Sequence, residues 1–168
     1  MKSDDNPNFA FLSYSKQARS VEQLFVVPKH FVVPDIIEER KPLAPTARRA
    51  GWIGCNIRLS MLPQTGKIYV VRNGEPQAKS LVQAQWQKTL FLRDSKLEAR
   101  GWLVDVMACC DQIGRAEFAI HDVYAFEGKL AVLYPGNRHI KHKMRQQLQV
   151  LRDSGYLEFL GRGRYRLI

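Results

Sequence analysis

The C-terminal stretch NRHIKHKMRQQLQVLRDSGYLEFLGRGRYRLI, residues 137–168, carries the strongest structural signal in this sequence. Asn137 is a suitable N-cap, and Gly155 stands where a left-handed residue closes a helix. Between them, apolar residues recur every three or four positions and so share one helical face. These residues are Ile140, Met144, Leu148 and Leu151. The pattern predicts an amphipathic helix.

A β-hairpin is predicted directly after this helix. Residues 156–160 and 164–167 have the composition of short strands, and Gly161-Arg162-Gly163 separates them as a turn. The hairpin therefore has an arginine at its tip. A helix followed by a basic hairpin is typical of a winged helix-turn-helix, whose main helix lies in a DNA groove.

The polar face of the helix and the hairpin supply candidate DNA contacts, because their side chains can donate hydrogen bonds to phosphates or base edges. The candidates are Arg138, Lys141, His142, Lys143, Arg145, Gln146, Gln149, Arg162 and Arg164. Arg145 and Gln146 are expected to reach bases, since arginine suits guanine and glutamine suits adenine.

The charge distribution supports a polyanionic partner. The chain of 168 residues has a formal net charge of +10, and from residue 137 onward it has eight basic against two acidic residues. A strongly basic balance concentrated on one element favours nucleic acid. The alternative interpretation is an ordinary solvated charged surface.

The three cysteines, Cys55, Cys109 and Cys110, form no CxxC pair, and the N-terminus does not resemble a signal peptide. We therefore expect the protein to lie in the reducing cytoplasm, with Cys109 and Cys110 buried as small apolar residues. No apolar run reaches the roughly 18 to 20 residues that span a bilayer, so no membrane association is expected.

Residues 1–94 are expected to form a first domain. After a frayed segment at residues 1–6, a strand is predicted at residues 8–14, and two short elements are predicted within 21–33, separated at Pro28. A helical turn at 35–40 and a basic loop at 41–52 follow. The remaining predicted elements are strands at 55–61 and 67–72, a turn at Asn73-Gly74, and a helix within 80–92.

Residues 95–168 are expected to form the second domain, able to fold alone and bind duplex DNA. Ser95 and Glu98 have the spacing of a capping box, and Gly114 is a natural helix end. The core face between them consists of Leu103, Val106, Met107, Cys110 and Ile113. A strand at residues 117–120 and short helices at 121–134, broken near Gly128, complete an α+β chain.

Catalytic and metal-binding patterns are weak. His139 and His142 have a spacing that a metal could use, but no third ligand is near in sequence. The segment from Glu75 to Lys79 contains a Q-x-K, but it lies in a predicted turn and has no paired aspartate on a neighbouring strand. We therefore assign no catalytic residue and no metal ligand. Trp52 lies between glycines after a basic loop; residue patterns alone favour a core tryptophan slightly over a contact residue.

Four segments resemble the DpnI family, also called Dam-replacing proteins, which are methyl-directed type II restriction endonucleases. These segments are LFVVPKHFVVP (24–34), RKPLAPTARRAGWIGCNI (40–57), KTLFLRDSKLEARGWLVD (88–105) and IKHKMRQQLQVLRDSGYLEFLGRGRYRL (140–167). The resemblance covers the family's C-terminal two-thirds. It implies a PD-(D/E)xK nuclease domain followed by a winged helix, both binding double-stranded G-A-T-C sites with methylated adenine. It also implies that Trp52 contacts the methyladenine.

The resemblance also implies a missing portion. The family's zinc cysteines, catalytic aspartates and lysine are expected before Met1, so residues 1–94 correspond to the C-terminal part of the nuclease domain. We expect this chain to bind no cofactor and not to cut DNA, although magnesium is expected for the full-length family enzyme. Two hypotheses stand: a restriction endonuclease fragment, and a non-catalytic reader or regulator of methylated DNA. The uncovered nuclease strands are expected to leave an exposed edge.

Overall fold

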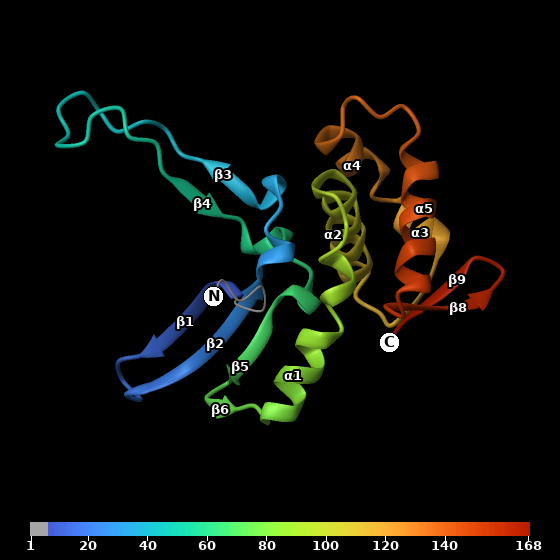
Figure 1. Ribbon diagram of the computed structural model, residues 1–168, viewed down its shortest axis with the longest axis horizontal. Coiled ribbons are helices and arrows are strands. Elements are labelled where there is room, and N and C mark those ends of the chain that lie inside the picture. Colours follow the sequence, from blue (N-terminus) through green and yellow to red (C-terminus); the bar gives the residue numbers. More distant parts are fainter. Residues whose placement is uncertain (1–6) are drawn as a thin grey trace.

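A computed structural model describes residues 7–168, so the frayed segment expected at residues 1–6 lies outside the described part. The chain forms two parts on either side of helix α2, Leu97–Gln112 (Figure 1). Both parts combine helices with antiparallel strands, which confirms the α+β class.

The first part is built on a four-stranded antiparallel sheet of order β1-β2-β5-β6. Its strands are β1 (Pro7–Ser15), β2 (Ser20–Pro28), β5 (Ile68–Arg72) and β6 (Glu75–Pro76). Pro28 ends β2 as predicted, because proline has no N–H to donate to a ladder. The predicted Asn73-Gly74 turn is also present, with φ of 53° and 81°. At the sheet edge, Leu12 and Tyr14 of β1 are exposed.

Short helical elements connect this sheet to α2. The 3-10 turns η1 (Lys29–Phe31) and η4 (Gln64–Gly66) flank the sheet, and helix α1 (Lys79–Gln87) with the turn η5 (Leu90–Leu92) fills the region predicted to be helical. His30 Nε2 lies 2.8 Å from Thr89 Oγ1, and that hydroxyl donates to the Trp86 carbonyl at 2.7 Å. His30 must therefore be the donor to Thr89, because the single hydroxyl proton is already used.

A two-stranded arm projects from the first part (Figure 1). It consists of β3 (Ile37–Glu39), the loop 40–54 and β4 (Cys55–Ile57), and we call residues 37–57 the arm. Two predictions were wrong here. The helical turn expected at 35–40 is limited to η2, Pro34–Ile36, and the strand expected at 55–61 ends at residue 57 before the turn η3, Leu59–Met61.

The pairing of β3 with β4 explains both differences. Residues 37–39 become a strand because β4 offers them hydrogen bonds, which no local pattern reveals. Beyond β4, the Arg58 N–H donates to the Ile36 carbonyl at 2.8 Å, and the chain then turns inward and buries Met61 and Leu62. Because these two consecutive side chains are both buried, residues after 57 do not show the alternation of buried and exposed side chains that is expected of a strand.

Helix α2 lies between the two parts, and each residue from 101 to 110 is buried. The predicted core face is present, and Cys109 and Cys110 are buried as expected, while Cys55 is exposed. The opposite face, which includes Trp102, is buried too. One hydrophobic cluster thus joins the two parts. Independent folding of residues 95–168 stays a prediction, and such a fragment would uncover part of α2.

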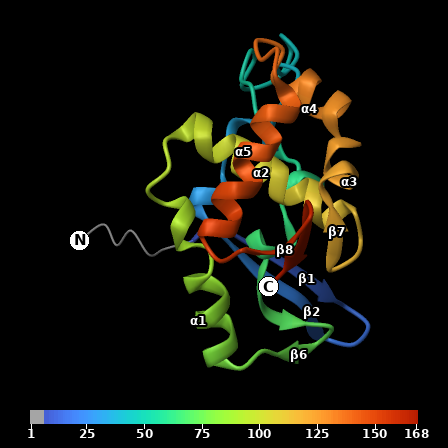
Figure 2. The same cartoon turned by 90° about the vertical axis from the view of Figure 1, so that its right-hand side faces the viewer.

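The second part has the element order of a winged helix-turn-helix. After α2 come β7 (Glu117–Ala119), α3 (Ile120–Tyr124), α4 (Glu127–Leu133), α5 (Ile140–Asp153), β8 (Leu157–Gly161) and β9 (Arg164–Leu167). The strands form an antiparallel sheet of order β7-β9-β8, at the foot of α5 (Figure 2). We call the β8–β9 hairpin the wing. No described helix meets the length and hydropathy needed to cross a membrane.

Several predicted boundaries in this part were displaced. The break between α3 and α4 falls at residues 125–126, and Gly128 lies inside α4. The N-cap of α2 is Lys96, without the predicted capping box; the Ser95 N–H instead donates to Leu92 and closes the preceding turn. Helix α5 begins at Ile140, because the Asn137 side chain accepts a hydrogen bond from the His139 N–H at 2.8 Å, in a turn before the helix.

The predicted helix ends are correct. Gly114 after α2 and Gly155 after α5 have φ of 74° and 75°, which glycine adopts without steric cost. The Tyr156 N–H then donates to the Leu151 carbonyl at 2.9 Å and closes the end of α5. The wing turn is shorter than predicted, since β8 continues through Gly161 and only Arg162 and Gly163 connect the strands.

Candidate nucleic-acid interface

Helix α5 separates its residues cleanly into a buried and an exposed face. The predicted apolar stripe is buried, together with Gln147. Most of the predicted DNA contacts on and beside α5 lie on the exposed face: Arg138, Lys141, His142, Arg145, Gln146 and Gln149. Lys143 is partly buried. The helix thus presents a continuous set of hydrogen-bond donors to solvent.

The wing is fixed against the start of α3. The Ile120 N–H donates to the Gly163 carbonyl at 2.8 Å, and a Cβ added to Gly163 would lie 3.3 Å from the Ile120 side chain. Arg162, at the tip, is exposed and has φ of 49°. Because the turn is anchored in this way, the backbone of Arg162 is held at the tip of the wing.

Intramolecular ion pairs divide the predicted contacts into two groups. Lys141 Nζ lies 3.1 Å from a Glu127 oxygen, and Arg164 Nη2 lies 2.9 Å from a Glu117 oxygen. Among the described residues, no ion pair involves the remaining predicted cations, which are Arg138, Lys143, Arg145 and Arg162. The second group can meet an anion without first losing a protein partner.

The turn before α5 is held by Tyr134, which follows α4. Its ring stacks on Trp102 of α2 with 3.8 Å between centroids and 17° between planes. Its hydroxyl donates to Asp105 Oδ2 at 2.6 Å and lies 3.4 Å from Asp35 Oδ2 in η2. Gly101 leaves the space, because an added Cβ would lie 3.2 Å from this hydroxyl. The start of α5 is therefore connected to α2 and to the base of the arm.

Asp105 is the most constrained acid of this junction. Its side chain is 2% exposed, and its Oδ1 atom has no hydrogen-bond partner among the described residues. The pKa of Asp105 is raised to about 6, mainly by burial; the hydrogen bond from Tyr134 opposes the shift, and the nearby Asp35 carboxylate contributes to it. A proton on Asp105 removes the cost of an ionised carboxylate in this buried place.

Trp52 lies on the arm and not in the core. Its side chain is 53% exposed, so the interpretation as an ordinary core tryptophan is wrong. The ring lies over Gly54, where an added Cβ would come within 2.9 Å of two ring atoms. It borders an apolar hollow of about 800 Å³ with, among others, Ile37, Ile53 and Leu97. Residues 40–58 contain five basic residues and no acid.

The structure does not bring the weak catalytic and metal-binding patterns of the sequence together into a site. Glu75 is on β6, whereas Lys79 begins α1. His139 is the N-cap of α5, and His142 is exposed on its outer face. Within residues 7–168, no group of three or more His, Cys, Asp or Glu side chains is placed to hold a metal ion. These residues do not fit a magnesium site, and we derive no catalytic step from them.

Sequence reasoning missed the residues that organise the interface. Glu117 and Glu127 pair with predicted DNA contacts, and Tyr134 and Asp105 hold the turn before α5. The only sequence signal for Glu117 was its place in a predicted strand, without a partner strand assigned. Tyr134 and Asp105 are 29 residues apart, and no local period connects them.

Helix α5, the β8–β9 hairpin and the exposed donors have the arrangement of a helix-turn-helix domain, the class of fold that DNA-binding proteins use, attached to an α+β first part. The comparison with known families is consistent with this class. The chain belongs to the Dam-replacing family: that family's model matches residues 1–95, and the model of the Dam-replacing HTH domain matches residues 98–167. The family and its helix-turn-helix domain point to DNA as the partner, in the setting of a restriction endonuclease.

Proposed function

We propose that this chain binds double-stranded DNA at adenine-methylated G-A-T-C sites, with α5 in the major groove and the wing on the backbone. The observation that carries the proposal is the exposed face of α5, where donors without ion-pair partners lie beside the anchored wing. Phosphate contacts supply most of the affinity of such proteins, and base contacts supply the sequence preference.

Arg145 and Gln146 are the residues that we assign to base readout. They are adjacent on the exposed face, and their side chains form bidentate pairs with guanine and adenine, two of the bases of G-A-T-C. We assign phosphate contacts to the flanking cations and donors: Arg138, Lys141, His142, Lys143, Gln149, Arg162 and Arg164.

Trp52 is the residue that we assign to the methyladenine. An exposed indole beside an apolar hollow can cover a methyl group and remove it from water. The surrounding basic arm supplies charge for the neighbouring phosphates. Gly54 supports this assignment, because its lack of a side chain leaves room for the ring.

We propose that the chain belongs to a methyl-directed restriction endonuclease that acts in the cytoplasm and uses magnesium. The alternative is a non-catalytic reader or regulator of methylated DNA. Both share the interface described above and differ in whether catalytic carboxylates accompany it. Incubating the purified chain with magnesium and a plasmid methylated at G-A-T-C separates them. We expect no cleavage by these 168 residues; cleavage that Glu75→Ala or Lys79→Ala abolishes would contradict that expectation.

Binding is tested with three duplexes: methylated G-A-T-C, the same sequence without methylation, and a random sequence. Arg145→Ala and Gln146→Ala should each weaken binding to the methylated site by about 1 to 3 kcal/mol and leave random DNA nearly unchanged. Gln149→Ala is the comparison on the same face: as a phosphate contact, it should weaken binding to all three duplexes alike. Equal losses on all three duplexes would reduce Arg145 and Gln146 to backbone contacts, and equal affinity for all three would overturn the proposed specificity.

A further inference from the structure

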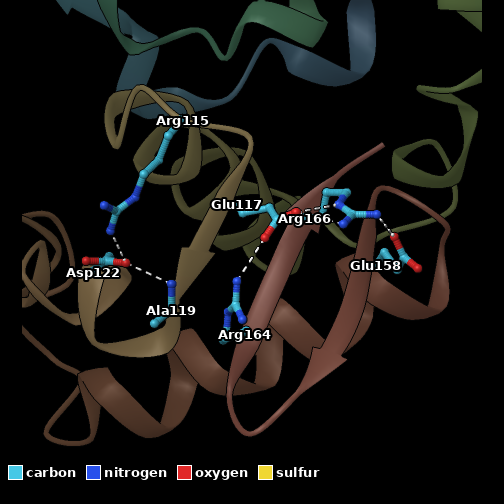
Figure 3. A network of polar contacts seen from close by, with 7 residues as sticks. All are labelled: Arg115, Glu117, Ala119, Asp122, Glu158, Arg164 and Arg166. Atoms are coloured by element: carbon cyan, nitrogen blue, oxygen red, sulfur yellow. Dashed lines mark hydrogen bonds and ion pairs between the residues drawn. The ribbon is translucent and has the colours of Figure 1, made fainter.

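The outer face of the wing sheet carries a ladder of alternating charges (Figure 3). Strand β9 lies between β7 and β8, and Arg166 is opposite Glu117 on one side and Glu158 on the other. Arg166 donates to Glu117 Oε1 from Nε at 3.0 Å and from Nη2 at 2.7 Å, and to Glu158 Oε2 from Nη1 at 3.2 Å. Two carboxylates therefore hold this guanidinium.

Glu117 also holds the arginine nearer the wing tip. Its second oxygen, Oε2, accepts a hydrogen bond from Arg164 Nη2 at 2.9 Å (Figure 3). Arg166, with Arg164, keeps the pKa of Glu117 below its ordinary range, so Glu117 is ionised at neutral pH. Arg164 is only two residues from Arg162 at the tip. One carboxylate thus binds the two arginines of β9.

These pairs lie at the surface, where another anion can compete for them. The side chains of Arg164, Arg166 and Glu117 are 59%, 46% and 41% exposed. An exposed ion pair in water is weak, so a DNA phosphate can replace a carboxylate as the partner of a guanidinium. Replacement still costs the protein one favourable pair. Arg162 at the tip makes no ion pair within the described residues and has no such cost.

We propose that Glu117 is a specificity-determining residue, which competes with DNA phosphate for Arg164 and Arg166 and thereby weakens binding to non-specific DNA. The proposal rests on the proposed binding of DNA by α5 and the wing. Non-specific complexes depend almost entirely on phosphate contacts. A complex on the preferred site also has base contacts, which can position the backbone closely enough to draw the arginines away from Glu117.

The test is Glu117→Gln in the full chain, which keeps the shape of the side chain and removes its charge. Affinity for a random duplex should rise about five-fold at moderate salt, and affinity for the methylated site should rise less. The dependence of binding on salt should also steepen, by about 0.9 in slope for each arginine that gains a phosphate.

Glu158→Gln is the matched control, because it removes the same charge from the same sheet face but touches only Arg166. It should change random-duplex affinity less than Glu117→Gln does. In an Arg164→Gln background, most of the gain from Glu117→Gln should disappear. Thermal unfolding of each variant checks that the wing remains folded.

The outcomes separate this inference from the proposed function. No change in affinity or salt slope with Glu117→Gln overturns the inference, as does an equal rise on both duplexes or an equal effect of Glu158→Gln. If the wild-type chain binds no duplex, or if Arg145→Ala has no effect on the methylated site, the proposed function has failed instead.

Discussion

Helices α2 and α5 are of similar length, sixteen and fourteen residues, but they differ in how much of their surface is buried. Helix α2 has no exposed residue from 101 to 110. Helix α5 buries five residues and leaves its charged face in solvent. The composition of each helix agrees with its burial. The central turns of α2 are mostly apolar on all sides, as in a buried helix, and α5 is amphipathic, as in a helix at the surface.

The difference shows where a ligand can act without unfolding the protein. Side chains of α2 contact both parts of the chain and the core, so they serve stability and position. Side chains on the outer face of α5 are exposed, and Arg145 there makes no ion pair among the described residues, whereas Lys141 is paired with Glu127. The two helices are connected by Tyr134, whose contacts with Trp102 and Asp105 fix the turn from which α5 starts.

The largest expected effect is on α2. Trp102→Ala should lower the free energy of unfolding by about 3 to 5 kcal/mol, because it removes a fully buried ring and its stacking on Tyr134. Urea denaturation measures the loss. The control on α5, Gln149→Ala, should change stability by less than about 0.5 kcal/mol. Similar losses for both would contradict the contrast between the helices.

The next effect depends on pH and also belongs to α2. The folded-state pKa of Asp105 is about 6, above its unfolded value near 4, so the folded state binds this proton more tightly. Stability from this group is present below about pH 4 and is lost as pH rises toward 6. Asp105→Asn removes that loss, and its stability relative to wild type should rise by on the order of 2 to 3 kcal/mol between pH 4 and pH 7.

The relative measurement is needed because His30 acts in the opposite direction. Burial lowers the pKa of His30 to about 4, so its contribution to stability falls as pH falls from 6.5 toward 4. This contribution is the same in both proteins and cancels in the difference. A difference that does not vary with pH would show that Asp105 ionises alike in the folded and unfolded states.

A smaller effect compares two tryptophans, one in α2 and one in the arm. Trp52→Ala should leave stability nearly unchanged, unlike Trp102→Ala, and should reduce the preference for methylated over unmethylated G-A-T-C by roughly 1 kcal/mol, about one buried methyl group. Gly54→Ala should act in the same direction, because the new Cβ displaces the ring. If Trp52→Ala lowers the unfolding temperature and leaves the preference intact, its role is structural.

The smallest effect is expected at Lys143, which is partly buried on α5. Lys143→Ala should reduce the slope of log affinity against log salt by about 0.9, since one phosphate contact is lost, without changing the preference among duplexes. Binding titrations at several salt concentrations measure the slope. An unchanged slope would remove Lys143 from the phosphate contacts.

The sequence by itself determined α5, its helix end at Gly155, the wing and three strands of the first sheet, β1, β2 and β5. These depend on periods of two or three to four residues and on turn residues, which are properties of neighbours along the chain. Residues 75–76, predicted as a turn, form the fourth strand, β6. Helix starts were less well determined. Asn137 and Ser95 are residue types that often cap helices, but each forms a hydrogen bond in the turn before its helix. A residue type that suits a cap suits a turn equally well.

Only the tertiary structure decided the arm, the all-round burial of α2 and the pairing of the predicted DNA contacts. Ile37–Glu39 is a strand because Cys55–Ile57 lies beside it, and Arg164 is paired because β7 places Glu117 next to it, 47 residues away in the sequence. The environment of Asp105 depends on Tyr134 and Asp35, which belong to different parts of the fold. Hydrogen bonds and charges act through space, so residues distant in sequence determine these partners once the chain has folded.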